Sequence, residues 1–130
     1  MSDKYRQLSA QKNNCKQGHW TGTPTGGSGS GCWLCVYGCA VLAYLYWKGK
    51  EPNKDNVTSL LDSNANVVWS KMGISEHSNI STPCIGKFKS KSHYVYISSV
   101  DEKTGICTLF DPGKRSNTSM NKSEFVSFYY

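Results

Sequence analysis

The most hydrophobic run of the chain predicts a buried helix. This run, CAVLAYLYWKGK, begins after Gly38 and holds about ten residues without glycine or proline before it reaches its lysines and Gly49. An apolar run of this length favours a helix, and basic residues followed by glycine are typical of a helix end. A second, short helix is expected to open at Pro52 and Asn53 and to place residues 57, 60 and 61 on one face.

The last third of the chain has a different pattern and predicts strands. Short stretches rich in β-branched and aromatic residues occur at 83–88, 93–100, 105–110 and 124–130. Residues 101–105, which end in glycine, predict a hairpin between the middle two stretches. Residues 62–81 show no pattern that predicts an element. A helical first half followed by an antiparallel sheet predicts an α+β fold.

The 130 residues are expected to form one domain, 1–130. Within it, residues 1–14 are a polar N-terminal segment and residues 21–31 (TGTPTGGSGSG) a Gly/Ser-rich loop. The longest apolar stretch, 32–47, is shorter than the roughly 20 residues of a membrane-spanning helix, so no transmembrane segment is expected. The N-terminus has no apolar run, which predicts synthesis in the cytoplasm without a signal peptide.

The net charge of +6 favours anionic partners. The lysines are scattered, and arginine occurs only at positions 6 and 115, which argues against specific nucleic-acid binding. Anionic lipid and anionic cell-wall polymers are the other anionic partners that the charge favours, and a monomer is expected.

Six cysteines are many for this length. An even count is compatible with three disulfides, but synthesis in a reducing cytoplasm predicts mostly free thiols. Cys84 and Cys107 lie on predicted strands and are expected in the core, whereas His77 stands in a polar stretch and is expected on the surface.

Three residues are placed so that they can act together. Cys39 lies in the first turn of the predicted helix, where free backbone N–H groups and the helix dipole stabilise a thiolate. His93 opens one predicted strand, and Asp111 ends the next. The hairpin brings these two strand ends side by side, so a histidine base and an orienting carboxylate are expected to be neighbours.

Two segments resemble the papain-like cysteine peptidases of the bacteriocin-leader (double-glycine) peptidase group. GSGCWLCVYGCAVLAYLYW resembles that group's GSG…GC-A-V-T-S-x-A-M segment. PCIGKFKSKSHYVYISSVDEKTGICTLFDPGKR is similar to its P-V-I…G-H-F-V-V-V-x-G-x-D…Y-x-I-N-D-P-G stretch, and EFVSFYY to its final strand. The likeness covers roughly residues 15–130, in order. The family's Thr-Ser after the nucleophile is replaced here by Leu42 and Ala43, and its glycine before the histidine by Ser92.

The resemblance implies a papain-like fold, with the helical half packed on the antiparallel sheet, and a Cys–His–Asp triad that needs no cofactor. Cys39 would be the nucleophile, His93 the general base and Asp111 the residue that orients the imidazole. Gln17 would supply the oxyanion hole, with Gln11 as an alternative. Family members cleave peptide bonds, and many small phage or bacterial relatives are associated with peptidoglycan.

A structural zinc site is the alternative use of the N-terminal cysteines. C-x-x-x-H followed by C-x-x-C supplies four ligands of the kind that hold zinc tetrahedrally: Cys15, His19, Cys32 and Cys35. Against it, Trp33 and Leu34 fill positions where metal knuckles usually carry small or polar residues. No metal is therefore assigned.

Together these observations predict a cysteine hydrolase that cleaves an amide bond of bacterial peptidoglycan. It would be an endopeptidase or amidase of the endolysin type, antimicrobial in effect, which passes from the host cytoplasm to the cell wall. One alternative is a protease that processes a leader peptide or another protein. Another is a non-catalytic binding module, zinc-stabilised, for an anionic partner.

Overall fold

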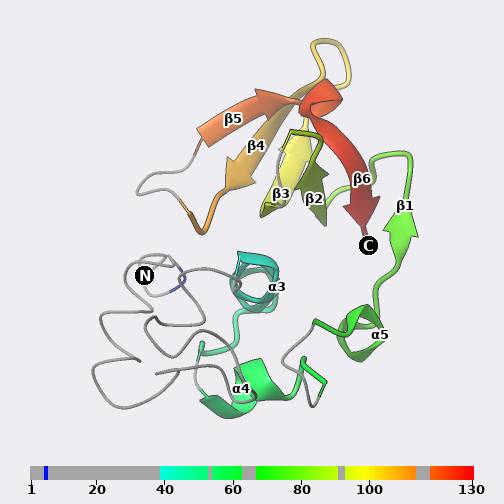
Figure 1. Ribbon diagram of the computed structural model, residues 1–130. Coiled ribbons are helices and arrows are strands. Elements are labelled where there is room, and N and C mark those ends of the chain that lie inside the picture. Colours follow the sequence, from blue (N-terminus) through cyan, green and yellow to red (C-terminus); the bar gives the residue numbers. More distant parts are fainter. Residues whose placement is uncertain (1–4, 6–38, 53, 63–66, 91–92, 114–117) are drawn as a thin grey trace.

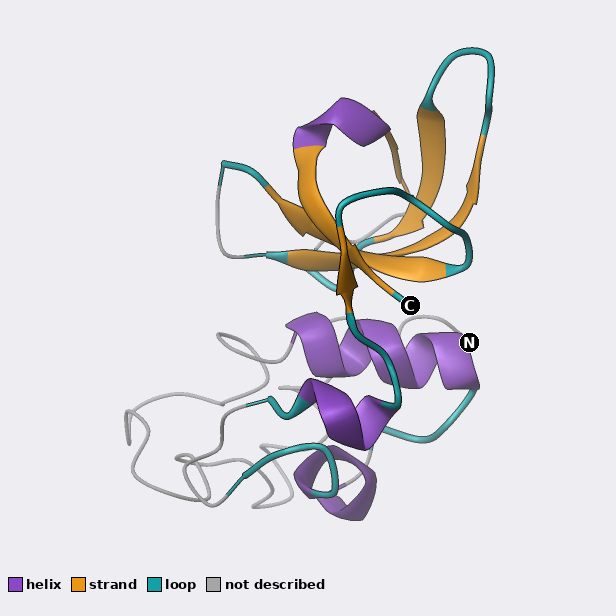
Figure 2. Cartoon of the chain, turned by 90° about the vertical axis from the view of Figure 1, so that its right-hand side faces the viewer, coloured by secondary structure: helices purple, strands orange, loops and turns teal. Residues whose placement is uncertain are grey.

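The computed structural model describes residues 5, 39–52, 54–62, 67–90, 93–113 and 118–130. Its helices are α3 (Cys39–Lys48), α4 (Lys54–Thr58), α5 (Trp69–Met72) and the 3-10 helix η3 (Lys122–Glu124). Its strands are β1 (Glu76–His77), β2 (Cys84–Phe88), β3 (Tyr94–Val100), β4 (Ile106–Phe110), β5 (Thr118–Asn121) and β6 (Phe125–Tyr129). Figures 1 and 2 show the sheet as one layer and the α-helices as a second layer against one of its faces. The described part of the chain is thus an α+β structure.

The sheet is antiparallel throughout and has the strand order β1-β6-β2-β3-β4-β5. Strands β2 to β5 follow one another as neighbours, as expected for consecutive hairpins. The last strand, β6, is inserted between β1 and β2. The C-terminal strand is therefore an inner strand of the sheet, and β1 lies next to it at the edge (Figure 1).

Helix α3 is apolar on all sides in its first two turns. Its first seven residues, 39–45, are all buried, and it packs against β3 and β2. Gly49, at φ +66°, ends the helix: its N–H donates to the carbonyl of Tyr46, and the N–H of Lys50 donates to the carbonyl of Leu45. This pair of bonds is a Schellman cap, for which glycine in the left-handed region is the preferred residue.

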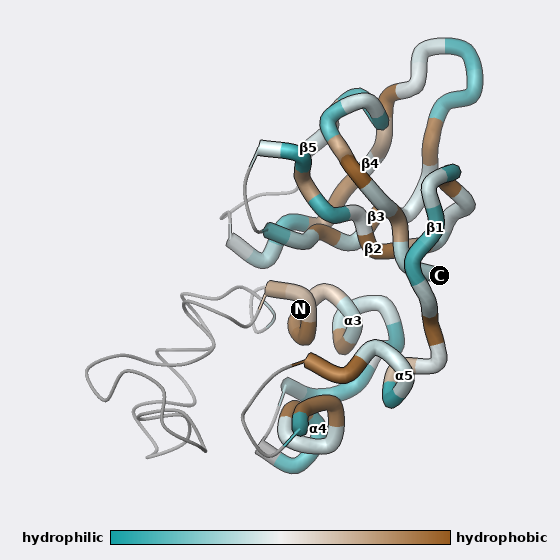
Figure 3. Tube along the Cα trace, turned by 45° about the vertical axis from the view of Figure 1, so that its right-hand side comes forward, coloured by the Kyte–Doolittle hydropathy of each residue, from teal (hydrophilic) through white to brown (hydrophobic). Residues whose placement is uncertain are grey.

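The two faces of the sheet belong to two hydrophobic clusters. One lies between α3 and the sheet and includes Leu42, Ile85 and Phe110, with Tyr94 and Tyr96 packed against it. The other lies on the opposite face, and its buried residues are Cys84, Phe88, Val95, Ile97, Cys107, Leu109, Phe125 and Phe128. Figure 3 shows hydrophobic residues along the strands and helices, and a hydrophilic hairpin loop beyond the end of the sheet.

That loop, 101–105, has the turn chemistry that its sequence predicts. The Asp101 side chain accepts from the N–H groups of Lys103 and Thr104, at 2.8 and 3.2 Å. Gly105 takes a φ of +75° and donates to the Asp101 carbonyl. The turn therefore fixes the register of β3 on β4.

The structure confirms the expected helix at α3 and the four expected strands, which are now β2, β3, β4 and β6. A short helix, α4, is confirmed, but it ends at Thr58, so the prediction that residues 60 and 61 lie on its face was wrong: Leu60 is in a turn and Leu61 is in a β-bridge with Val67. Helix α5 and strands β1 and β5 lie in stretches for which the sequence predicted no element. Within the described residues the helical half is smaller than expected, because α4 and α5 have only five and four residues.

Three side chains can be compared with their expected environments. Cys84 and Cys107 are free thiols with no exposed surface, as predicted. The prediction for His77 was wrong: its ring is half-buried and stacks on Tyr130, 3.8 Å between centroids. Tyr5, in the polar N-terminal segment, is also buried, against Tyr46. No helix within the described residues is long and apolar enough to span a membrane.

Candidate active site

Cys39 is the first residue of α3 and is 6 % exposed. The backbone N–H groups of a helix's first turn have no partner within the helix, and they carry its partial positive charge. The first turn of a helix is a common position for a nucleophilic cysteine. The hydrophobic residues that follow Cys39 anchor the helix against β3, so the position of the thiol is fixed relative to the sheet.

His93 and Asp111 meet at one edge of the sheet. His93 directly precedes β3, and Asp111 directly follows β4. The antiparallel register of these strands, with Tyr96 opposite Phe110, puts the start of one beside the end of the other. The His93 Nε2 and Asp111 Oδ1 atoms are 2.6 Å apart. Only 1 % of the Asp111 side chain is exposed, so this charged contact is shielded from water.

Asp111 is held by the turn that follows it. Its Oδ1 also accepts from the N–H of Gly113 at 2.8 Å, which is the hydrogen bond of an Asx turn. The proline between the two residues is buried. The carboxylate therefore has a fixed orientation toward His93, and the DPG sequence supplies that orientation locally.

The His93 ring links the carboxylate to the nucleophile. The Cys39 side chain also lies close to the ring, near enough to contribute with Asp111 to the raised pKa of His93. Because Nε2 is engaged by Asp111, Nδ1 is the ring nitrogen that remains for the thiol. The ring of Phe88 lies parallel to the imidazole, 5.5 Å between centroids, and packs against it. The structure thus brings Cys39, His93 and Asp111 into one connected group.

The surroundings of His93 favour its charged form. Burial by itself lowers its pKa, but the hydrogen bonds to Asp111 and Cys39 and the negative charges of these groups outweigh burial and raise the pKa from 6.5 to about 9. Such a strongly perturbed histidine between a thiol and a buried carboxylate is typical of a functional site. Chemically, the group can supply a nucleophile, a proton carrier and an orienting charge.

Beside this group lies a cluster that the sequence pattern did not single out. Trp69 stacks on Tyr129, with ring centroids 3.9 Å apart, and both rings lie close to that of Tyr94. The Tyr129 hydroxyl donates to Glu76 Oε2 at 3.3 Å. These residues come from α5, β6, β3 and β1, so no local spacing in the sequence relates them.

The other residues that the sequence proposed lie outside the described part of the chain. They are the oxyanion candidates Gln17 and Gln11 and the zinc-ligand candidates Cys15, His19, Cys32 and Cys35. Within the described ranges, no group of three or more His, Cys, Asp or Glu side chains is arranged to hold a metal ion.

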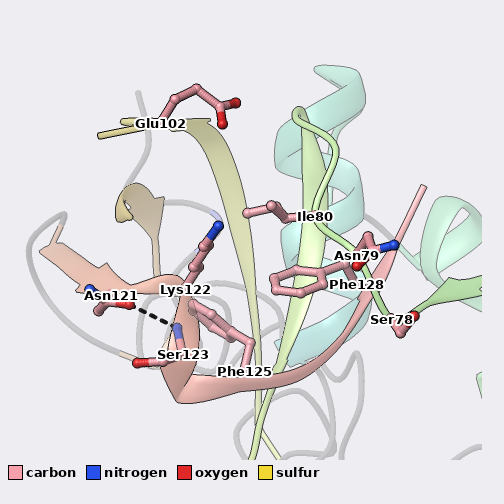
Figure 4. A pocket seen from close by; sticks show the side chains of 9 residues that line it. All are labelled: Ser78, Asn79, Ile80, Glu102, Asn121, Lys122, Ser123, Phe125 and Phe128. Carbon is pink, nitrogen blue, oxygen red and sulfur yellow. Dashed lines mark hydrogen bonds between the residues drawn. The ribbon is translucent and has the colours of Figure 1, made fainter. Parts of the chain in front are cut away.

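A hollow of about 450 Å³ lies elsewhere on the molecule and shares no residue with the Cys39–His93–Asp111 group. Figure 4 shows Ile80, Phe125 and Phe128 among the residues that line it, with Lys122 beside them and Glu102 above. Its apolar residues belong to the cluster on the face away from α3, and Glu102 comes from the hairpin at the far end of β3 from His93.

Comparisons of the chain with protein-family models, with curated proteins and with solved structures found no match.

Proposed function

We propose that the protein is a papain-like cysteine hydrolase that cleaves an amide bond. The observation that supports this most directly is the connected contact of a thiol, an imidazole and a buried carboxylate: Cys39, His93 and Asp111. A nucleophile next to a base, with the base oriented by a third group, is the arrangement required for covalent catalysis by acyl transfer.

The reaction follows from these contacts. The Cys39 thiolate attacks the amide carbonyl carbon, and the carbonyl oxygen takes up the negative charge. The protonated His93 gives its proton to the departing amine, the carbon–nitrogen bond breaks, and a thioester remains on Cys39. Water then attacks the thioester while His93 takes a proton from it, which releases the carboxylic acid and restores the thiol–imidazole pair.

Asp111 keeps the imidazole in place through both steps. Its bond to Nε2 leaves Nδ1 directed at the sulfur and stabilises the charge that the ring carries. The backbone N–H groups at the start of α3 are suited to stabilise the developing oxyanion, because they point outward from a helix N-terminus. Gln17 is the proposed second donor.

The proposed substrate is bacterial peptidoglycan. The net charge of +6 favours an anionic wall polymer over a neutral substrate, because it raises the rate of encounter. The resemblance to small phage and bacterial hydrolases points the same way. A protein-directed protease with the same triad is the alternative, and the products of the reaction distinguish the two.

The test compares wild type with Cys39→Ala on purified Gram-positive and Gram-negative peptidoglycan, by turbidity loss and by mass analysis of soluble fragments. The expected result is fragments from the wild type only, with activity of Cys39→Ala lower by at least about 10³-fold, as for other removed nucleophiles. The fragment masses identify the bond that is cut.

Cys107→Ala is the matched control, because it removes another buried cysteine on the opposite face of the sheet. It is expected to retain activity as long as circular dichroism shows it to be folded. Equal activity of wild type and Cys39→Ala would refute the role of Cys39. A folded, inactive Cys107→Ala would show that the loss is not specific to the triad.

A further inference from the structure

Glu76, Tyr94, Tyr129 and Trp69 form what we term the aromatic–carboxylate cluster, which adjoins the triad. Tyr94 directly follows His93, and its phenol is close enough to Cys39 for the charge of that thiol to affect its pKa. Trp69 and Tyr94 are half-buried and Glu76 is exposed, so the cluster opens to solvent. A substrate bound with its scissile carbonyl at Cys39 would therefore pass beside these side chains.

The hydroxyl proton of Tyr129 is directed toward Glu76. The Tyr129 hydroxyl donates to Glu76 Oε2 at 3.3 Å, which uses its only proton. The Tyr94 ring lies beside that of Tyr129, with 6.0 Å between the ring centroids. Burial and neighbouring groups raise the pKa of Tyr94 to about 12 and also raise that of Tyr129, so both phenols keep their protons at neutral pH.

What Glu76 has left to offer a ligand is an acceptor. Its second carboxylate oxygen can accept hydrogen bonds, as can the lone pairs of the two phenol oxygens, and the Tyr129 proton is already used. Within the described residues, Glu76 makes no ion pair, although Lys87 lies opposite Tyr94 on β2. No cationic side chain of that part of the chain therefore neutralises the negative charge of Glu76.

We propose that the aromatic–carboxylate cluster binds a positively charged amino group of the substrate, next to the scissile amide. An ammonium group supplies three donors and a positive charge, and aromatic rings around it add a cation–π attraction. A carboxylate or phosphate would meet the like charge of Glu76 there. The inference rests on the proposed function and specifies its substrate: a peptide with a free amino group, from a diamino acid or a free N-terminus, beside the bond that is cut.

The test uses purified Gram-positive peptidoglycan and the same material after N-acetylation, which turns each free ammonium group into a neutral amide. The variant is Glu76→Gln, whose amide oxygen still accepts from Tyr129. The matched control is Glu102→Gln, an exposed glutamate in the hairpin at the other end of β3. Initial rates at low substrate give kcat/KM for each protein on each substrate.

Wild type and Glu102→Gln are expected to cleave the unmodified material roughly 10-fold faster than the acetylated one, as expected for one charge-assisted hydrogen bond. Glu76→Gln is expected to lose this preference. Its kcat/KM should fall on the unmodified material and stay unchanged on the acetylated material. Cleavage of both materials at equal rates by wild type, or a preference that persists in Glu76→Gln, would overturn the inference while leaving the proposed function intact.

A binding measurement tests the cluster without any reaction. The indole N–H signal of Trp69 is followed by NMR while lysine amide, or its fully N-acetylated form, is added at millimolar concentration. A saturable shift with lysine amide, absent with the acetylated form and in Glu76→Gln, is expected. If wild type hydrolyses no wall material but shows this shift, the proposed function fails and the ammonium site stands; absence of the shift in wild type overturns the site.

Discussion

Replacement of Asp111 by asparagine isolates the effect of one buried charge on His93. The Asp111 Oδ1 atom accepts from His93 and from the N–H of Gly113, and an amide oxygen accepts from both in the same way. The substitution thus keeps the shape and the acceptor but removes the charge. Burial lowers the pKa of His93, whereas the hydrogen bond to Asp111 and the charge of Asp111 raise it. Without that charge, the pKa is expected to fall from about 9 toward or below 6.5.

The same change has a consequence for stability. The rise of the His93 pKa from 6.5 to about 9 corresponds to roughly 3 kcal/mol, at about 1.4 kcal/mol for each tenfold change in proton affinity. His93 binds its proton more tightly in the folded state, so this stabilisation is fully present below pH 6.5 and is lost as the pH rises through 9. In Asp111→Asn, this pH-dependent loss between pH 6.5 and 9 should be largely absent.

The assay is an NMR titration of the His93 ring, together with urea unfolding at pH 6 and pH 9.5. Asp101→Asn is the matched control, because Asp101 is exposed in the hairpin at the far end of β3 and should leave the titration of His93 unchanged. A wild-type His93 that titrates at or below pH 6.5 would refute the reasoning. So would an Asp111→Asn variant in which the ring still titrates near pH 9.

Two further predictions concern the sheet. A Cβ at Gly86 would lie 2.7 Å from Ile97 Cδ1 and 2.8 Å from Phe125 Cδ1, so Gly86→Ala should lower the free energy of unfolding by about 1–3 kcal/mol in urea denaturation; an unchanged midpoint would contradict the packing. Cys84 and Cys107 have no exposed surface, and burial above all raises the pKa of the Cys84 thiol, to about 12. Both should resist iodoacetamide in the folded protein and react in urea, as read by peptide mass analysis; rapid alkylation without urea would contradict their burial.

The best-predicted elements are those whose pattern is local. The run that forms α3 is hydrophobic and ends in a glycine that caps the helix. Both features are visible in the local sequence, so the helix could be predicted from it. Strands β3 and β4 are joined by a loop whose aspartate and glycine make the turn themselves. Because that hairpin puts the start of β3 beside the end of β4, it also explains why His93 and Asp111 are in contact.

The elements that were not predicted have little local signal. Strand β1 is two residues long and exists because it pairs with β6, which lies about fifty residues later at the C-terminal end of the chain. Strand β5 has the sequence TSMN, which shows no alternation of buried and exposed residues. Helix α5 is a single turn in which Met72 is buried and Gly73 ends the helix. Such short elements are stabilised by their neighbours rather than by their own residues.

The sequence by itself determined the helix that carries Cys39, the hairpin that joins His93 to Asp111 and the charge of the whole chain, because each depends on residues near one another or on composition. Only the tertiary structure decided that Cys39 reaches His93 and that Glu76 meets Tyr94 and Tyr129. Those contacts require α3 to pack across β3 and β6 to enter the sheet beside β1. The physical reason is that burial and strand pairing between distant segments are properties of the assembled fold, to which no spacing along the chain corresponds.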